Sequence, residues 1–191
     1  MSPARSGRRD PYRRRLSALL LPAAFFNGYD GQLRALLLPQ LQHSFHVDLA
    51  TIGAASVPIG AGQFVAFLVV RLADRVGRRP ILLVSLLFYA LFTGLTALAD
   101  SVWAFAAFQG LAQVAIGTEF ALAVIVLAEE TPGDERGRAL GRLLVAGPLG
   151  AIFTAGLLGA GLGRTALGWR AFYLVGLAPI LLLALARRSL R

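Results

Sequence analysis

Long apolar stretches separated by short polar segments dominate the chain from residue 16 to residue 186. A helix needs about 20 mostly apolar residues to cross the roughly 30 Å hydrocarbon core of a bilayer, and each stretch has about that length. Hydrophobic residues make up 57% of the chain, whereas a soluble domain usually has about 45–50%. The sequence therefore predicts an all-α membrane protein with a basic tail at 1–15 and six transmembrane helices at 16–38, 52–70, 80–99, 102–128, 139–162 and 168–186.

The net charge of +9 is unevenly distributed, and all 19 basic residues are arginine. Six spans place the tail, the loops at 71–79 and 129–138 and the C-terminus on one side, which then holds fifteen arginines. The other side holds two, Arg164 and Arg170. Because arginine-rich segments stay in the cytoplasm, we expect both termini there, in a multi-pass protein of a bacterial plasma (inner) membrane. The same rule and the attraction to anionic headgroups account for the basic charge without nucleic-acid binding.

The first predicted helix carries polar residues in its middle, among them Asn27, Asp30 and Arg34. An ionised side chain at the centre of a bilayer costs about 2.5–3.5 kcal/mol, so such residues normally face a cavity or a partner. Asp30 and Arg34 stand four residues apart and share a helix face, so they can pair. Two interpretations stay open: the two charges merely neutralise each other, or they face a functional cavity.

The fourth predicted helix contains a second intramembrane acid, Glu119, together with Gln109 and Gln113. Asp30 and Glu119 are the acids that the sequence places inside the predicted spans. Glu119 is either a functional carboxylate or a buried structural acid paired with a loop arginine. The two amides are candidate polar contacts for a bound solute.

Several classes of function find no support in the residue pattern. The chain has no cysteine, which excludes a disulfide framework and a thiolate metal site. His43 and His46 fall in a predicted outer loop, where such histidines are usually solvated, so we expect no metal. A nucleophile–base pair and a phosphate-binding loop are also missing from the pattern. We therefore expect neither an enzyme nor a cofactor.

The loop between the second and third predicted helices reads Leu72-Ala73-Asp74-Arg75-Val76-Gly77-Arg78-Arg79. It resembles the Gly-x-Leu-Ala-Asp-Arg-x-Gly-Arg-Arg signature that the major facilitator superfamily carries between its second and third helices. Val70 stands in place of the first glycine. The match falls after the second of six predicted crossings and on the arginine-rich side, where the resemblance requires it.

Further stretches resemble transporters of the same superfamily. Glu129-x-x-Pro132-x-x-x-Arg136-Gly137 is similar to the loop after helix four in sugar-porter-like and organic-acid members, and Gly168-Trp169-Arg170 to the start of their helix six. Gly117-Thr118-Glu119-Phe120 is similar to helix four of metabolite and aromatic-acid proton symporters, and Gly28-Tyr29-Asp30 to their helix one. Gln109 stands where an arginine is often found.

The resemblance implies the N-terminal half of a major facilitator fold, with six helices arranged as two inverted three-helix repeats. It also implies secondary active transport of an organic acid or sugar-like solute, by proton symport and alternating access. In that scheme Asp30 or Glu119 carries the proton, because one acid falls in each of two equivalent cavity-lining helices. The residues expected to contact the solute are Arg34, Asn27, Gln109 and Gln113. The residues expected to form a cytoplasmic gate are Asp74, Arg75, Gly77, Arg78, Arg79, Glu129 and Arg136.

Two other functions stay open on the sequence. A partial match around Gly147 and Pro148 to the fifth-helix motif of drug antiporters allows half of a drug/proton antiporter. The chain is also compatible with a truncated, non-transporting membrane protein that needs a second half. The partners that we expect are a small-molecule substrate, protons, the lipid bilayer, and either a second six-helix half or a second copy of the chain.

Overall fold

The computed structural model describes residues 11–178, apart from the side chains of residues 11–19 and of Arg79. Its regular elements are α1 (Pro11–Phe45), α2 (Leu49–Val76), α3 (Arg78–Ala97), α4 (Val102–Glu130), α5 (Gly133–Gly159), the short 3-10 helix η1 (Leu162–Arg164) and α6 (Arg170–Val175). The fold is all-α, as predicted, and residues 11–178 contain no strand. The sixth predicted helix extends to residue 186, so its second half lies outside the described residues.

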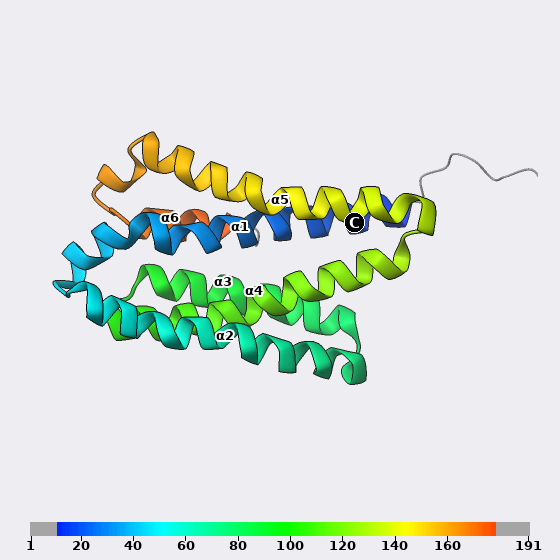
Figure 1. Cartoon of the computed structure of the whole chain (residues 1–191), viewed down its shortest axis with the longest axis horizontal. Helices are drawn as coiled ribbons and strands as arrows, with labels where there is room; N and C mark the ends of the chain where they lie inside the picture. The colour runs from blue at the N-terminus through cyan, green and yellow to red at the C-terminus, as the bar shows by residue number, and fades with distance from the viewer. Residues whose placement is uncertain (1–10, 179–191) are drawn as a thin grey trace, which may run out of the picture.

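The helices form an elongated bundle built around α1 and α4 (Figure 1). α5 packs along α1, α2 and α3 pack along α4, and α1 and α4 also touch each other. Apolar residues of α1, α4 and α6 meet in the main core, where Leu33, Leu37 and Phe172 are fully buried. The two helices that carry the candidate acids therefore lie in the middle of the bundle.

Four helices in the described part of the chain are long and apolar enough to cross a membrane: Leu49–Val76, Pro80–Ala97, Val102–Glu130 and Gly133–Gly159. α1 is not among them, because Asn27, Asp30, Gln32 and Arg34 lower its hydropathy. The middle of α1 is instead buried in the bundle, where Asp30 has no exposed surface. Polar residues are tolerated there because protein rather than hydrocarbon surrounds them.

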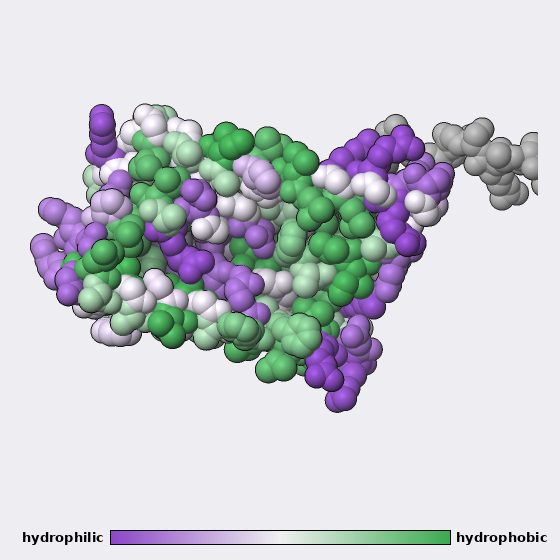
Figure 2. Space-filling model, viewed as in Figure 1, coloured by the Kyte–Doolittle hydropathy of each residue, from purple (hydrophilic) through white to green (hydrophobic). Residues whose placement is uncertain are grey.

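Polar and apolar residues are unevenly distributed over the surface of the bundle (Figure 2). Hydrophilic residues gather at its two ends and in a patch in the middle of the face shown, and apolar and small residues surround that patch. The exposed apolar side chains include Phe64 and Phe67 of α2, Phe88 of α3 and Ile152 of α5. Exposed apolar surface on this scale marks contact with a membrane or with another protein chain.

Glycines let two pairs of helices approach closely. A Cβ on Gly28 of α1 would lie 2.6 Å from the Cα of Gly147 in α5, and a Cβ on Gly150 would lie 2.9 Å from the backbone nitrogen of Tyr29 in α1 and nearer still to the carbonyl oxygen of Phe25. A Cβ on Gly62 of α2 would lie 3.3 Å from the backbone nitrogen of Val114 in α4 and nearer still to the carbonyl oxygen of Gly110. Small residues permit such packing inside a membrane, where water supplies no hydrophobic drive between helices. The small residues of the second and fifth predicted helices thus mark crossings with α4 and α1.

Capping side chains fix where two of the helices begin. Asp48 precedes α2, and its Oδ1 accepts a hydrogen bond of 2.9 Å from the backbone N–H of Thr51. Ser101 precedes α4, and its Oγ accepts a hydrogen bond of 3.2 Å from the backbone N–H of Ala104. Each cap satisfies a backbone donor that the first helical turn leaves free.

α1 continues past the end that the sequence predicts for it. The pattern predicts an end at residue 38 and an outer loop from Pro39, but the helix runs through Pro39 to Phe45. Leu41 is buried in the core, and the Phe45 ring packs against the rings of Phe105 and Trp169. This packing offsets the hydrogen bond that a proline removes from a helix interior. The loop between α1 and α2 is therefore reduced to residues 46–48.

Candidate functional site

Asp30 lies in a hydrogen-bonded chain that links α1, α4 and α2. Its Oδ2 accepts a hydrogen bond of 3.0 Å from Nε2 of Gln113. Oε1 of Gln113 accepts in turn a hydrogen bond of 2.7 Å from Nε2 of Gln63 in α2. Asp30 and Gln113 are buried, whereas Gln63 lies on the exposed face of α2. The chain therefore connects a fully buried carboxylate with the surface of the bundle.

Asp30 keeps one oxygen for a further partner. Its Oδ1 is buried and accepts no hydrogen bond from the described residues. The rings of Tyr29, Tyr89 and Tyr173 lie within electrostatic reach of the carboxylate and are buried as well. Because a buried polar atom without a partner is costly, this oxygen is suited to bind a proton or a polar group of a solute.

Asp30 and Arg34 share a face of α1, as predicted, but they do not form an ion pair. No nitrogen–oxygen distance between these two side chains falls within 4.0 Å. The Nε of Arg34 is buried and donates no hydrogen bond to any described residue. The two charges are therefore not joined by a direct contact, and Arg34 acts on the Asp30 carboxylate through space.

Asn27 and Gln109 flank the Asp30–Gln113 contact. Nδ2 of Asn27 donates a hydrogen bond of 3.4 Å to the carbonyl oxygen of Ile116 in α4. Gln109 is fully buried, one turn before Gln113 on α4. The structure thus brings Asn27, Asp30 and Gln113 to one interface between α1 and α4, with Gln109 a turn away.

Glu119 is buried on α4 but stands apart from this chain of hydrogen bonds. The residue is 7% exposed, and it forms no ion pair with a described arginine. It stands six positions after Gln113, which places the two side chains about 120° apart around a helix of about 3.6 residues per turn. The structure therefore does not bring the two candidate acids into one contact.

The two histidines near the C-terminal end of α1 lie on the surface of the bundle. The ring centroids of His43 and His46 are 6.2 Å apart, and both residues are exposed. Within the described residues, no three side chains among His, Cys, Asp and Glu are grouped so that they could hold a metal ion.

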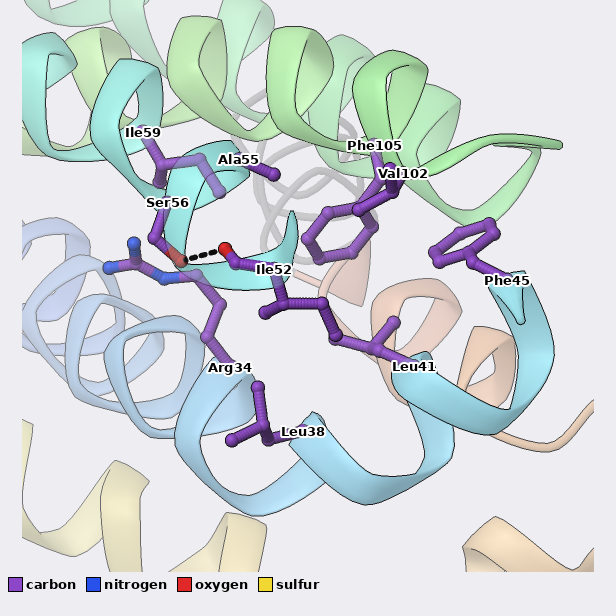
Figure 3. Close-up of a pocket in the computed structure, with 10 residues that line it drawn as sticks. All are labelled: Arg34, Leu38, Leu41, Phe45, Ile52, Ala55, Ser56, Ile59, Val102 and Phe105. Carbon is purple, nitrogen blue, oxygen red and sulfur yellow. Dashed lines mark hydrogen bonds between the residues drawn. The ribbon is translucent and has the colours of Figure 1, made fainter. Parts of the chain in front are cut away.

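A cavity of about 40 Å³ lies between α1, α2 and α4, one helical turn beyond Asp30. Arg34 is the charged residue in its lining, and Ser56 is the other polar one. Figure 3 shows the guanidinium of Arg34 beside Ser56, which donates a hydrogen bond of 2.9 Å to the carbonyl oxygen of Ile52. The rest of the lining is apolar: Leu38, Leu41, Phe45, Ile52, Ala55, Ile59, Val102 and Phe105.

Three of the expected cytoplasmic-gate residues meet where α2 and α4 end and α3 begins. Arg78 donates hydrogen bonds to Glu129 and, at 3.5 Å, to Asp74. The bond from Arg78 to Glu129 raises the pKa of the arginine, which keeps its charge at neutral pH. Gly77 joins α2 to α3 with a φ of 107°, a backbone conformation that favours glycine. Arg75 and Arg136 are exposed at the same end of the bundle.

Gln63 and Ser56 are site residues that the sequence pattern does not single out. They are the polar side chains of a span at 52–70 that otherwise consists of small and apolar residues. This contrast is the sequence feature that could have identified them as site residues. Gln63 meets Gln113 across 50 positions of sequence, so the contact follows from the helix packing and not from a local motif.

The bundle has an apolar surface between polar ends, close glycine crossings and buried carboxylates on its central helices. These are the features of a polytopic membrane protein of the transporter class. The chain belongs to the major facilitator superfamily, whose sequence profile matches residues 20–190. The signature in the loop at 72–79 and the fold point to the same family.

The sequences of several known proteins match most of this chain. YncC of Bacillus subtilis, named for metabolite transport, is 32% identical over 89% of it. The gentisate transporter of Corynebacterium glutamicum is 29% identical over 87%, and the sialic acid transporter NanX of Escherichia coli is 25% identical over 86%. The chain spans 38% of the first two proteins and 40% of NanX.

A solved structure has the same fold. The crystal structure of a bacterial homolog of the human lysosomal transporter Spinster, in an inward-facing and occupied conformation, matches 92% of this chain with a TM-score of 0.77. The match covers 44% of that chain at 19% identity. The fold is therefore that of the N-terminal half of a major facilitator transporter, and the described residues supply α1 to α5 and the start of α6.

Proposed function

We propose that this chain works in the secondary active transport of a small organic acid or sugar-like solute, by proton symport and alternating access. Family membership supports this proposal, as do two relatives, a sialic acid transporter and a gentisate transporter. The observation that carries it is the buried carboxylate of Asp30, which has one hydrogen-bonded oxygen and one without a partner. The scheme involves no covalent step, and thus neither an enzymatic activity nor a cofactor.

In this proposal Asp30 is the proton carrier. Gln113 donates to Oδ2, which leaves Oδ1 to take the proton. Gln63 accounts for the orientation of the Gln113 amide. The Nε2 of Gln63 donates a hydrogen bond to Oε1 of Gln113, and this bond turns the Gln113 amide nitrogen toward Asp30. Glu119 is the second candidate, since it is buried on the other central helix. The groups proposed to contact the solute are Arg34, Asn27, Gln109 and Gln113.

The cluster of Asp74, Arg78 and Glu129 is proposed as a latch at the cytoplasmic end of the bundle. Its ion pairs join the start of α3 to the ends of α2 and α4. Charge pairs of this kind can hold one conformation and break in another. The count of fifteen arginines against two supports a cytoplasmic position for this end and for both termini.

A second six-helix half, or a second copy of the chain, is the proposed protein partner in the plasma (inner) membrane. α2 and α5 lie at the outside of the bundle and expose Phe64, Phe67, Leu149 and Ile152. A transporter of this family closes its pathway between two halves, so these apolar faces are suited to that contact.

The test of the proposed function is uptake into proteoliposomes that contain the protein. Gentisate, sialic acid and a neutral sugar would be offered with and without an inward-directed proton gradient. We expect accumulation of at least one solute that depends on the gradient and disappears when a protonophore collapses it. Solute flux that is independent of the gradient would contradict proton coupling, and the absence of flux for every solute would contradict transport of this substrate class by the chain without a second half.

A further inference from the structure

Gln63 of α2 reaches toward the Asp30 carboxylate from the surface of the bundle. Its Nε2 donates a hydrogen bond of 2.7 Å to Oε1 of Gln113, and Nε2 of Gln113 donates one of 3.0 Å to Oδ2 of Asp30. Gln63 is exposed, whereas Gln113 and Asp30 are buried. A side chain of α2 therefore stands only two hydrogen bonds from a carboxylate that has no exposed surface.

Gly117 leaves the space that the Gln63 amide occupies. Gln113 and Gly117 are four residues apart, so they lie on the same face of α4, one turn from each other. A Cβ on Gly117 would lie 3.0 Å from Oε1 of Gln63 and 3.0 Å from the Cβ of Ala66, closer than ordinary van der Waals contact. Because Gly117 has no side chain, Gln63 can lie against α4 with its Oε1 over the glycine and its Nε2 toward Gln113.

The bond from Gln63 leaves the Gln113 amide one orientation. A primary amide carries an oxygen that accepts hydrogen bonds and, on the other side of the same carbon, a nitrogen that donates them. Since the N–H of Gln63 holds the oxygen of Gln113, the nitrogen of Gln113 faces Asp30. A donor in this position stabilises the ionised carboxylate, whereas a proton on Oδ2 would need an acceptor there.

We propose that Gln63 is a positioning residue that weakens the binding of a proton to Asp30, and that Gly117 makes room for it. The inference rests on the proposed function, because it assigns Gln63 a role in the same proton site. Without the Gln63 donor the Gln113 amide is free to turn, and a protonated Asp30 gains the acceptor that it otherwise lacks. A residue on the outer helix α2 thereby controls a proton bound on α1.

The charged and titratable groups around Asp30 stay in place when Gln63 is changed. α2 carries no charged side chain between residues 49 and 70, and α5 carries none between residues 143 and 159. The other buried acid of α4 is Glu119. The groups within electrostatic reach of the carboxylate are Arg34 and Tyr29 on α1, Tyr89 on α3 and Tyr173 on α6. A substitution of Gln63 by a neutral residue therefore tests the amide and not a change of charge.

The test is an infrared titration of the purified protein in a detergent without ester or carboxyl groups. A protonated carboxyl group has a C=O stretching band that an ionised one lacks. The band of Asp30 is identified by subtracting the spectra of Asp30→Asn, and its intensity is followed over the pH range in which the protein stays folded. The midpoint of this titration is compared between the unsubstituted protein and its variants.

Gln63→Met keeps a side chain of similar length and removes the amide. We expect it to move the midpoint to higher pH, with about a fivefold gain in proton affinity, the size expected for one hydrogen bond. Gly117→Ala should move the midpoint in the same direction, because its methyl group displaces the Gln63 amide. Gly117→Ala should add no further shift in the Gln63→Met protein.

Thr118→Val is the matched control for helix packing. The Oγ1 of Thr118 also joins α4 to α2, by a hydrogen bond of 3.4 Å to the carbonyl oxygen of Ala66, but it is not part of the chain from Gln63 to Asp30. We expect an unchanged midpoint in Thr118→Val. An unchanged or lower midpoint in Gln63→Met, an equal shift in Thr118→Val, or the absence of a titrating band that depends on Asp30 would overturn the inference.

This experiment separates the inference from the proposed function. The titration is measured at equilibrium, without solute or proton gradient, so a protein that fails to transport can still show the shift in Gln63→Met. Conversely, gradient-driven uptake together with an unchanged midpoint in Gln63→Met would leave transport standing and would remove the role of Gln63.

Discussion

At the scale of single residues, Tyr29 fixes the position of the neighbouring Asp30. Its hydroxyl donates a hydrogen bond of 2.7 Å to the carbonyl oxygen of Phe172 in α6. Its own carbonyl oxygen accepts a bond of 3.1 Å from the hydroxyl of Thr154 in α5. One buried residue thus ties α1 to two other helices at the level of the candidate carboxylate.

Tyr29→Phe should therefore destabilise the bundle. The change removes one buried hydrogen bond and leaves the ring in place, which typically costs about 1 kcal/mol. Thermal unfolding in detergent would show a lower midpoint. A midpoint equal to that of the unsubstituted protein would mean that the Tyr29–Phe172 contact does not contribute to stability.

The cap of α2 gives a pH-dependent prediction. Hydrogen bonds from Thr51, first its side chain and then its backbone N–H, hold the pKa of Asp48 below its usual value. The stability that this cap contributes is therefore complete above the unfolded pKa of about 3.9, and it is lost as the pH falls through the lower folded pKa.

Asp48→Asn keeps a capping oxygen but removes the titration. The unfolding midpoint of the unsubstituted protein should approach or fall below that of Asp48→Asn as the pH drops from 7 to 3. Most of the change is expected below pH 4. A difference between the two midpoints that stays constant over this range would contradict the predicted role of the Asp48 charge.

At the scale of elements, the α1–α5 crossing depends on glycines that face a neighbouring backbone. Gly150 sits against α1, whereas Gly156, two turns later on α5, has no atom within 4 Å of the position of a Cβ. Both residues are glycines of α5, but an added methyl group would meet the α1 backbone at Gly150 and no atom at Gly156. An alanine substitution at each position therefore separates the effect of helix packing from that of helix propensity.

Gly150→Ala should destabilise the protein by about 1–3 kcal/mol, because an added methyl must push the α1 and α5 backbones apart. Gly156→Ala should be neutral or stabilising, by up to about 1 kcal/mol, because alanine favours a helix over glycine. Unfolding midpoints in detergent compare the two variants. Equal effects would contradict the close crossing at Gly150.

Sequence patterns predict the helices well but not their contacts. The apolar runs and the small-residue spans are local features, so they identify α2 to α5 and the crossing helices. The extension of α1 through Pro39 follows from the packing of Leu41 and Phe45, which no local rule predicts. The Gln63–Gln113 bond likewise joins residues 50 positions apart. The missing Asp30–Arg34 ion pair is a matter of side-chain direction, which residue spacing alone does not determine.

At the scale of the whole molecule, the latch at the cytoplasmic end is proposed to report the conformational state. Arg78 bridges Asp74 and Glu129, and all three side chains reach solvent. An isolated surface ion pair contributes little to stability, at most about 1 kcal/mol. The latch should therefore act on the opening of this end and not on overall folding.

Glu129→Gln should loosen the junction of α2 and α3 at residues 71–79 without lowering the unfolding midpoint noticeably, because the Arg78 guanidinium loses its charged partner on α4. Hydrogen–deuterium exchange of that junction measures the change. Glu130→Gln, at the neighbouring exposed acid, serves as the control and should exchange like the unsubstituted protein. Equal exchange in all three proteins would contradict the latch.

Proton coupling at Asp30 is the central claim, and it is tested most directly by comparing gradient-driven accumulation with solute exchange in Asp30→Asn. Exchange moves solute in both directions and needs no net release of a proton, whereas accumulation against a gradient needs one. We predict that Asp30→Asn abolishes proton-driven accumulation in proteoliposomes and retains exchange of the same solute. Accumulation at the level of the unsubstituted protein would contradict the claim, and would leave Glu119 as the remaining buried candidate for the proton.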